Sequence, residues 1–481
     1  MHYVAVAPLA VSRRDTYTYR TDSEVPAGTV VAIPYAGRQG LGVVMEAAGP
    51  DERAKRAVPT EERLPAWQLR FGRGLAEAYL APLGQTMGLF LPKWRGGPAA
   101  GFAETGSKSA AAASADRRRS RPEIRIGGAA GLDGLVLVPE RAMLKQFTAE
   151  GPCFSGTAPV PERRDIWEQV RNGTAKPVFG TRSALFLPWK RLDQVVVLHE
   201  DELGHQNDRT PRYHAREAAR LLAEAHGARL ILASPAPSLR AWELAGLPQA
   251  KAGAEAKAEG AASPTLISPK YDGFDDPLPH GFIEKLAELP GPVLVHTVQS
   301  RVRQVRDAVK ASGAPGAKVA GLSNITVGGQ STVLAGKRYG SVVTLGIDAI
   351  LARPGFMVTE RAVALLRKLG GILQPNGPLL VYSKHRDHPA FAALSKPYGT
   401  FLQEEMRDRE ALSLPPVRPL VRISTAKDDR PKIEKALGQS DIDPRRVRYA
   451  TEDGSLTVLI KGDPKRLRGL ISPERRIGVE Y

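Results

Sequence analysis

The sequence predicts a multidomain α/β protein in which a small β-rich N-terminal domain precedes two parallel α/β lobes and a small α+β C-terminal domain. Three observations lead to this fold class. The chain has 481 residues, which is more than one hydrophobic core ordinarily serves. Short apolar strands alternate with amphipathic helices in two successive parts of the chain. Stretches rich in alanine, glycine and arginine separate these parts.

The β-rich domain is expected over residues 1–95. Its apolar runs are separated by Pro, Gly and Asp turns, a pattern typical of a closed or half-closed β domain, and they lie at residues 4–7, 29–33 and 41–46. A helix is expected over residues 65–79, where large apolar side chains recur at every fourth position. These side chains are Trp67, Phe71, Leu75 and Tyr79.

The two α/β lobes are expected over residues 131–247 and 264–397, with a flexible basic linker at 96–130 and an Ala-rich linker at 248–263. In the first lobe we expect strands at 135–138, 177–180, 195–198 and 229–233, and helices at 140–149 and 213–226. In the second lobe we expect strands at 293–296, 341–347 and 378–382, and helices at 299–311 and 358–370. Residues 398–481 form the predicted α+β C-terminal domain.

Composition favours a polyanion as the partner. The net charge is +17 and the pI is near 9.9, and nucleic acid is the commonest polyanion of a cytoplasm. No apolar run approaches the roughly 20 residues of a membrane span, and no basic region precedes the apolar N-terminal stretch, so neither a membrane nor a secretory signal is expected. The single cysteine, Cys153, excludes an intramolecular disulfide and a Cys-based zinc cluster. A cytoplasmic location follows by elimination.

Several ordered segments resemble the primosomal protein N′ (PriA-type replication restart) family. They are YTYR at 17–20, PAGTVVAIPYAGR at 26–38, YLAPLGQTMGLFLP at 79–92, LVLVPERAMLKQF at 135–147, GTRSALFLP at 180–188, PRYHAREAA at 211–219, ASPAPSL at 233–239 and MRDREALSLPPVRPLVRIS at 406–424. The resemblance implies an N-terminal domain that binds the 3′ end of DNA, followed by two RecA-like helicase lobes. It also implies Arg182 and Arg212, which stand in two of these segments, as DNA-binding residues.

The sequence departs from the family where ATP would be used. No GxxxxGK[ST] phosphate loop is present, and the nearest string, at 101–109, has an extra residue before Lys108 and lies in the linker. Aligning on the PRYHAR segment places Leu198 and His199 at the family's Mg²⁺-binding acidic pair. The acidic residues 200–202 are then shifted along the chain and are expected to face solvent. Ile372 and Pro375 stand where the family has arginine-finger residues.

Two further modules of the family are also missing from the sequence. Its zinc cysteines are replaced by the Ala-rich linker and its surroundings, and residues 96–130 take the place of its winged helix. We therefore expect a degenerate helicase that needs no cofactor and no metal.

The resemblance assigns DNA-end recognition to five positions, which are Tyr17, Thr18, Tyr35, Gly37 and Arg38. An aromatic ring can stack on a terminal base, and the backbone amide of a glycine can approach DNA closely. Thr18 replaces the family's Asp, and Asp15 is a candidate to compensate from the preceding turn. Tyr19 is expected to be an ordinary strand residue.

Other candidate chemistry is weak. The spacing of His199, His205 and His214 matches no usual metal site, so surface or helix-capping roles are expected. The histidines at 385 and 388 are expected to be solvated, and so is the basic helix at 301–310. Arginines and lysines of the linker and the C-terminal part are expected to contact phosphates; they are Arg117, Arg118, Arg119, Arg121, Lys465, Arg466, Arg468, Arg475 and Arg476.

The functional prediction is a protein without its own ATPase that binds branched DNA at stalled forks and helps to recruit or load the replicative helicase. Its implied partners are forked DNA with 3′ ends, primosome and replication-restart proteins, and single-stranded DNA-binding protein. Two alternatives stay open. One is an active ATP-dependent 3′–5′ helicase with an unrecognised nucleotide site, and the other is a protein–protein scaffold.

Overall fold

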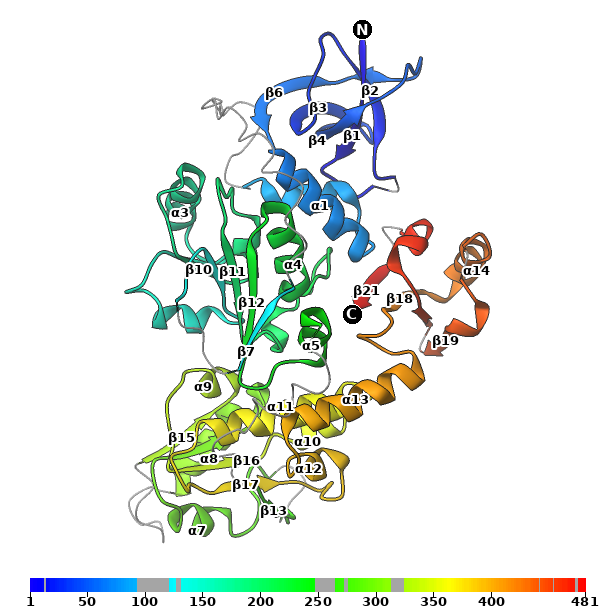
Figure 1. Ribbon diagram of the computed structural model, residues 1–481. Helices are drawn as coiled ribbons and strands as arrows, with labels where there is room; N and C mark the ends of the chain where they lie inside the picture. Colours follow the sequence, from blue (N-terminus) through cyan, green and yellow to red (C-terminus); the bar gives the residue numbers. More distant parts are fainter. Residues whose placement is uncertain are drawn as a thin grey trace.

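The computed structural model describes four successive units of chain, each built on its own sheet (Figure 1). The described residues are 1–12, 14–92, 121–126, 131–246, 264–271, 276–312, 324–440, 442–452, 454–471 and 475–481. We call the units the N-terminal unit (1–92), the first lobe (121–246), the second lobe (264–397) and the C-terminal unit (398–481). Most of the predicted basic linker, including Lys108 and Arg117–Arg119, lies outside the described residues, so the predicted domain boundaries remain predictions.

The N-terminal unit is a curled sheet capped by two helices. Its strands follow the order β5-β2-β1-β4-β3-β6, and their bounds are β1 His2–Pro8, β2 Tyr17–Thr21, β3 Thr29–Tyr35, β4 Arg38–Ala47, β5 Lys55–Arg56 and β6 Val58–Arg63. The two edge strands, β5 and β6, are separated in the chain by Ala57 alone, so the sheet must curl back on itself. The helices are α1 (Ala66–Ala78) and α2 (Leu83–Met87). The predicted apolar face of α1 is confirmed, because Phe71, Leu75 and Tyr79 are buried.

The first lobe is a parallel sheet with the order β7-β12-β11-β8-β10-β9. Its strands are β7 Glu123–Ile126, β8 Leu135–Leu137, β9 Cys153–Phe154, β10 Val178–Gly180, β11 Gln194–Leu198 and β12 Arg229–Ser234. Its α-helices are α3 Val160–Asn172, α4 Ala215–His226 and α5 Leu239–Ala245. The helix predicted at 140–149 is a short 3₁₀ helix, Arg141–Gln146, whose first turn has no side-chain cap to stabilise a longer α-helix.

The second lobe is also parallel, with the order β13-β17-β16-β14-β15. Its strands are β13 Thr265–Ile267, β14 Val293–His296, β15 Ile325–Gly328, β16 Ser341–Thr344 and β17 Leu379–Tyr382. Its helices are α7 Phe282–Ala287, α8 Val302–Ser312, α9 Gln330–Val333, α10 Asp348–Leu351, α11 Val358–Gly371 and α12 Pro389–Ala393. Strand-to-helix alternation in both lobes gives the multidomain α/β architecture that the sequence predicts.

The long helix α13 (Tyr398–Leu412) leads from the second lobe to the C-terminal sheet. This sheet is antiparallel, with the order β19-β20-β18-β21, and its strands are β18 Leu420–Ala426, β19 Val447–Glu452, β20 Ser455–Lys461 and β21 Arg476–Glu480. Helix α14 (Arg430–Gly438) covers one face, where Val421, Ile423 and Val458 are buried. The other face is turned toward the two lobes.

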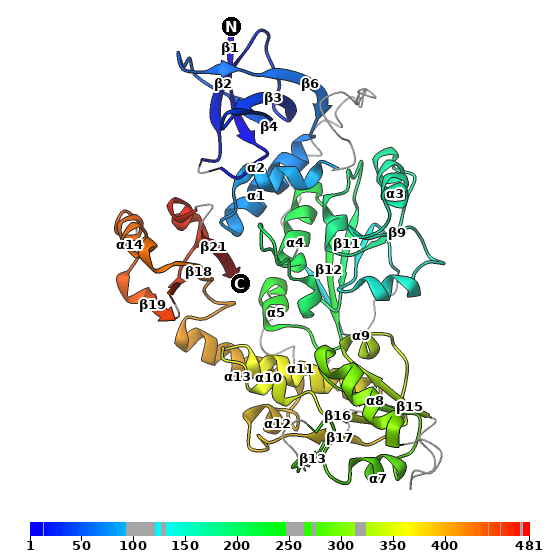
Figure 2. The ribbon, with the colours of Figure 1, turned by 180° about the vertical axis from the view of Figure 1, so that it is seen from behind.

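One apolar core runs through the N-terminal unit, the first lobe and the C-terminal unit. The ring of Phe71 in α1 stacks on that of Phe186 in the first lobe, with their centroids 5.6 Å apart. Tyr481 contacts Tyr79 edge to face from the C-terminal side, also at 5.6 Å. Seen from behind, α1 lies above α4, and the C-terminal unit lies beside both (Figure 2). These three units therefore pack as one body, although linkers separate them in the sequence.

Candidate nucleic-acid interface

The predicted end-binding residues lie at one end of the N-terminal sheet. Ala36 and Gly37 form the tight turn between β3 and β4, and both have positive φ, 48° and 77°. A Cβ built at Gly37 would meet nothing within 4 Å, so the backbone of this turn is open to a ligand. Arg38 follows the turn and is exposed.

Tyr17 and Tyr35 form an aromatic pair beside this turn. Their ring centroids are 5.6 Å apart at an interplanar angle of 66°, and both side chains are half-buried. The hydroxyl of Tyr35 donates to the backbone carbonyl of Val11 at 3.3 Å, which fixes its ring. Tyr19 is buried and its hydroxyl donates to the carbonyl of Pro34, so the prediction that it is an ordinary strand residue is confirmed.

Thr18 and Asp15 do not complete this pair in the way that the sequence suggested. Strand alternation puts Thr18 on the face of β2 opposite to Tyr17 and Tyr19. Asp15 is already engaged, because one of its carboxylate oxygens forms an ion pair with Arg468 of the C-terminal unit. The other oxygen accepts a hydrogen bond from the backbone N–H of Leu83 at 3.3 Å. Asp15 thus joins two units rather than facing a DNA end.

The acidic residues that follow β11 are buried, which corrects the expectation that they face solvent. Glu200 has no exposed surface; it accepts hydrogen bonds from the Arg216 guanidinium at 2.7 Å and from the backbone N–H of Ser238 at 2.6 Å. Its carboxylate therefore closes a buried network inside the first lobe. The Arg216 that it holds is the last residue of the PRYHAR segment.

The next two carboxylates reach across to the second lobe. Asp201 and Glu202 both form ion pairs with Lys368 of α11, whose side chain is 4% exposed. Glu202 also accepts a hydrogen bond from the amide of Gln330 at 2.6 Å. Burial opposes the charge on Lys368, but the two carboxylates outweigh burial and raise its pKa above the ordinary lysine value.

Two of the four residues predicted at lost ATPase positions, Leu198 and His199, directly precede this network in the chain. Leu198 is a buried core residue at the end of β11, and His199 follows it with a positive φ of 50°. Burial lowers the pKa of His199 to about 4, so its ring is neutral at physiological pH. Ile372 follows α11 and packs against the second-lobe core, whereas Pro375 is exposed.

Two other histidines have structural roles. His214 caps α4 by accepting a hydrogen bond from the N–H of Arg216 at 3.2 Å, which confirms the capping prediction. His205 is fully buried, so a surface role is wrong. Its Nε2 contacts the carbonyl of Leu198 at 2.8 Å, because the turn at 203–205 folds back onto the end of β11.

A cavity of about 1120 Å³ opens between the first lobe, the second lobe and the C-terminal sheet. The face of the C-terminal sheet that looks into it carries basic side chains at alternating strand positions, namely Arg422, Arg448, Lys461 and Arg476. Register supports this common face, because Arg422 pairs with Leu459 and Leu459 pairs with Arg448. Arg212 of the first lobe and Arg353 and Arg361 of the second lobe line the opposite walls.

Basic side chains outnumber carboxylates among the described residues that line this cavity, although several of them, such as Arg422 with Glu480, form ion pairs. Burial, together with the positive charge of Arg476 in the C-terminal unit, lowers the pKa of Arg212 in the first lobe. The pKa of Arg361 is also lowered, and burial is the largest cause. Like charges brought together in a cavity favour an anionic ligand, because its binding relieves their repulsion.

Most of this surface was not predicted from the sequence, and two of the basic residues predicted to contact phosphates form ion pairs within the protein. Arg475 is nearly buried and paired with Asp429, and Arg468 is paired with Asp15, so both hold the protein together. Arg182 donates to the carbonyl of Gly204 at 3.1 Å and thereby supports the 203–207 loop. The signal for the cavity residues is the alternation of basic and apolar side chains in RVRY (446–449), where Arg446 and Arg448 stand on either side of the buried Val447 and indicate a basic sheet face.

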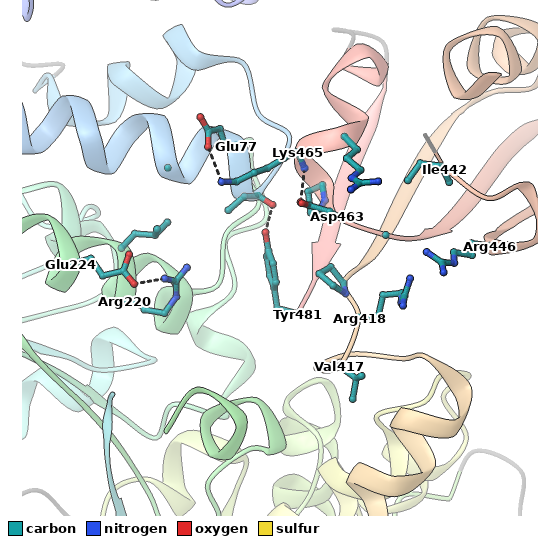
Figure 3. Close-up of a pocket in the computed structure, with 17 residues that line it drawn as sticks. Glu77, Arg220, Glu224, Val417, Arg418, Ile442, Arg446, Asp463, Lys465 and Tyr481 are labelled. Atoms are coloured by element: carbon teal, nitrogen blue, oxygen red, sulfur yellow. Dashed lines mark hydrogen bonds and ion pairs between the residues drawn. The ribbon is translucent and has the colours of Figure 1, made fainter. Parts of the chain in front are cut away.

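A second cavity of about 630 Å³ lies where α1, α4 and the C-terminal unit meet (Figure 3). Arg418 and Arg446 point into it beside Val417 and Ile442, and an ion pair between Arg220 and Glu224 stands on the α4 side. Lys465 bridges to Glu77 of α1 at 3.4 Å. This cavity therefore lies at the interface between the three packed units.

Among the described residues, no cluster of three or more His, Cys, Asp or Glu side chains is arranged to hold a metal ion. No helix among them is both long enough and apolar enough to span a membrane.

Comparison with known proteins agrees with this geometry at the N-terminus. Residues 4–92 match the model of the PriA 3′DNA-binding domain. The PriA replication restart protein of Bacillus subtilis is 30% identical over 122 residues, which are 24% of this chain and 15% of that protein. That of Helicobacter pylori (strain 26695) is 26% identical over 275 residues, 50% of this chain and 44% of its own length. That of Synechocystis is 36% identical over 121 residues, 23% and 15% of the two chains.

The matched part spans less than half the length of each of these relatives. The matches agree on one family name, and the N-terminal domain model carries the same name. The chain is thus similar to the PriA-type replication restart proteins, and its residues 4–92 match their 3′DNA-binding domain.

Proposed function

We propose that this protein binds branched DNA at stalled replication forks and helps to recruit or load the replicative helicase, without hydrolysing ATP itself. The observation that carries the proposal is the 3′DNA-binding domain, with its Tyr17–Tyr35 pair beside an open backbone turn. A terminal base leaves its stack at less cost than an internal one, and the aromatic pair offers it a new stacking partner.

The basic cavity extends this proposal to the rest of the fork. We propose that the two lobes are a RecA-like pair and that DNA phosphates lie against the basic face of the C-terminal sheet. Arg212, predicted from the PRYHAR segment, lies on the opposite wall of the same cavity. Arg182 is the other predicted contact. Its guanidinium already donates hydrogen bonds to Gly204 and Asn207 of the 203–207 loop, so a role in DNA binding has less support.

End recognition is tested with the Tyr17→Ala variant of the full chain. Base–aromatic stacking contributes about 1–3 kcal/mol, so affinity for a fork with a 3′-hydroxyl leading-strand end should fall roughly 5- to 150-fold. Fluorescence anisotropy with competing forks that end in a 3′-hydroxyl or a 3′-phosphate measures the preference. Arg38→Ala should weaken all DNA forms alike, because a phosphate contact carries no information about the end.

Tyr3→Ala is the matched control, since Tyr3 is a half-buried aromatic of β1 outside the Tyr17–Tyr35 pair. It should leave the preference for a 3′-hydroxyl unchanged. If Tyr17→Ala also leaves this preference unchanged, the pocket does not read DNA ends and the proposal loses its main support.

We expect no ATP hydrolysis, with or without single-stranded DNA. Leu198 and His199 cannot hold Mg²⁺ at the position of the acidic pair, and Asp201 and Glu202 already form ion pairs with Lys368. Loss of an arginine finger alone lowers turnover by about 10³-fold or more. Phosphate release measured over hours on purified protein tests this, with Lys108→Ala as the control for a hidden phosphate loop. A DNA-stimulated rate of about one per second that Lys108→Ala abolishes would establish the helicase alternative.

The proposed partners are primosome and replication-restart proteins, and single-stranded DNA-binding protein is a further proposed partner. A scaffold that binds proteins alone is the remaining alternative. The excess of basic side chains in the cavity supports nucleic acid as its partner, because nucleic acid is the commonest polyanion of a cell.

A further inference from the structure

The contact between the two lobes contains a buried group of charges contributed by both sides. Lys368 of α11 in the second lobe lies between Asp201 and Glu202, which follow β11 in the first lobe. The Lys368 side chain is 4% exposed, and those of Asp201 and Glu202 are 10% and 11% exposed. Charges so far from water are stable only while their partners stay in place.

Further hydrogen bonds hold the same contact. Gln330 of α9 donates to Glu202 at 2.6 Å, and Ser234 at the end of β12 donates to Asp201 at 2.6 Å. The carboxylate of Glu360 in α11 accepts from the backbone N–H of Leu239 at 2.9 Å. The bonds of Gln330 and Glu360 cross between the lobes and the bond of Ser234 orients Asp201, so together they favour one relative position of the lobes.

Apolar packing on both sides of the charges supports the same geometry. Ala236 and Leu239 of the first lobe belong to the second-lobe core, and Leu334 of the second lobe packs into a first-lobe core. Opening the contact would therefore expose apolar surface and also leave a lysine unpaired in a dry site.

We propose that Lys368 is a positioning residue that fixes the two lobes at a single separation, which neither nucleotide nor DNA changes. The contact lies on the wall of the basic cavity, since Asp201, Glu202 and Lys368 all line it. Lys368 thereby sets the spacing between Arg212 on one lobe and Arg361 on the other. This last step rests on the proposed function, because it takes the cavity as the DNA surface.

The separation of the lobes can be measured directly in the full-length protein. Spin labels would be attached to cysteines introduced by Glu168→Cys in α3 and Lys310→Cys in α8, both exposed, in a Cys153→Ser background. Pulsed dipolar spectroscopy then gives the distribution of interlobe distances. We expect one narrow distribution that is unchanged by Mg²⁺ with ATP and by forked DNA. A second population in the parent protein, or a shift on adding ATP, overturns the proposal.

Lys368→Met should broaden this distribution by several ångströms or split it, because it leaves two carboxylates facing each other. Lys396→Met is the matched control, since Lys396 forms an ion pair with Glu404 inside the same part of the chain but both side chains are nearly half exposed. It should behave like the parent protein. If Lys368→Met folds, by near-UV circular dichroism, and keeps the parent distribution, Lys368 does not position the lobes.

Gln330→Ala keeps the test decisive if Lys368→Met fails to fold. It removes one interlobe hydrogen bond but leaves every charge paired, so a smaller broadening is expected; the parent distribution in this variant would count against the proposal. Fork affinity, measured on the same samples, separates the two proposals. A parent protein with fixed lobes that does not bind forks contradicts the proposed function and leaves the positioning role intact.

Discussion

Fork binding is expected to weaken by about 10³- to 10⁵-fold between 50 and 200 mM salt, as is typical when six to ten phosphates are contacted. The physical reason is that each phosphate neutralised by Lys or Arg releases counterions, which adds about 0.9 to the log–log slope on duplex DNA. The cavity offers basic side chains that form no salt bridge with a described carboxylate, namely Arg212, Arg353, Arg361, Arg446, Arg448, Lys461 and Arg476. Anisotropy titrations across this range of salt give the slope.

Single variants should then show how much each residue contributes to the slope of log affinity against log salt concentration. Arg448→Ala and Arg476→Ala are each expected to lower it by about one. Arg445→Ala is the matched control, because Arg445 belongs to the same unit but is 91% exposed and paired with Asp443. A flat salt response in the parent protein, or equal effects of Arg445→Ala and Arg476→Ala, would contradict the proposed DNA surface and favour the scaffold alternative.

Glu200→Gln is expected to cost about 3–5 kcal/mol of unfolding free energy, which is typical when one partner of a buried ion pair is removed. Glu200 is completely buried, and the neutral amide would leave Arg216, whose side chain is 9% exposed, with only its longer contact to Glu217 at 3.9 Å. Urea unfolding followed by circular dichroism measures the change, provided that the slope of free energy against urea stays the same.

Glu224→Gln is the natural comparison for this variant. Glu224 pairs with Arg220 on the same helix as Arg216, but its side chain is 37% exposed, so its loss should cost about 1 kcal/mol or less. The pair of variants also distinguishes two roles for Glu200. A Mg²⁺ ligand would lose ATP turnover in the Gln variant with little change in stability, whereas a structural carboxylate shows the reverse. Equal small costs at both positions would contradict the buried network.

Periodicity predicted the elements of this protein well, because local sequence determines which face of an element is apolar. The helix expected at 358–370 is α11, Val358–Gly371, and the buried run at 195–198 ends β11. The apolar face of α1 was likewise visible in its fourfold spacing. Short elements were less predictable, since the uncapped segment after Pro139 forms only a 3₁₀ helix.

The candidate site was less accessible to sequence reasoning, because its geometry depends on distant partners. Glu202 was expected to face solvent, because its partner Lys368 lies 166 residues further along the sequence. Asp15 looked free to help at a DNA end, yet Arg468, 453 residues away, already holds it. The tyrosine pair was predicted because the family resemblance named both positions. No resemblance named the basic sheet face, although the alternation in its strands was present.

The shared core has a consequence for how this protein can be divided. The chain leaves the N-terminal unit at about residue 92, yet α1 buries Phe71 and Leu75 in a core that belongs equally to the first lobe and the C-terminal unit. The backbone N–H of His214 in the first lobe also donates to the hydroxyl of Tyr79 at 3.0 Å. A fragment cut at the sequence boundary would therefore present a bare apolar helix to water and tend to aggregate. The N-terminal unit therefore does not end, as a folding unit, where its sequence ends, and a fragment that folds as the unit does in the whole protein has to include α4 and the C-terminal strands.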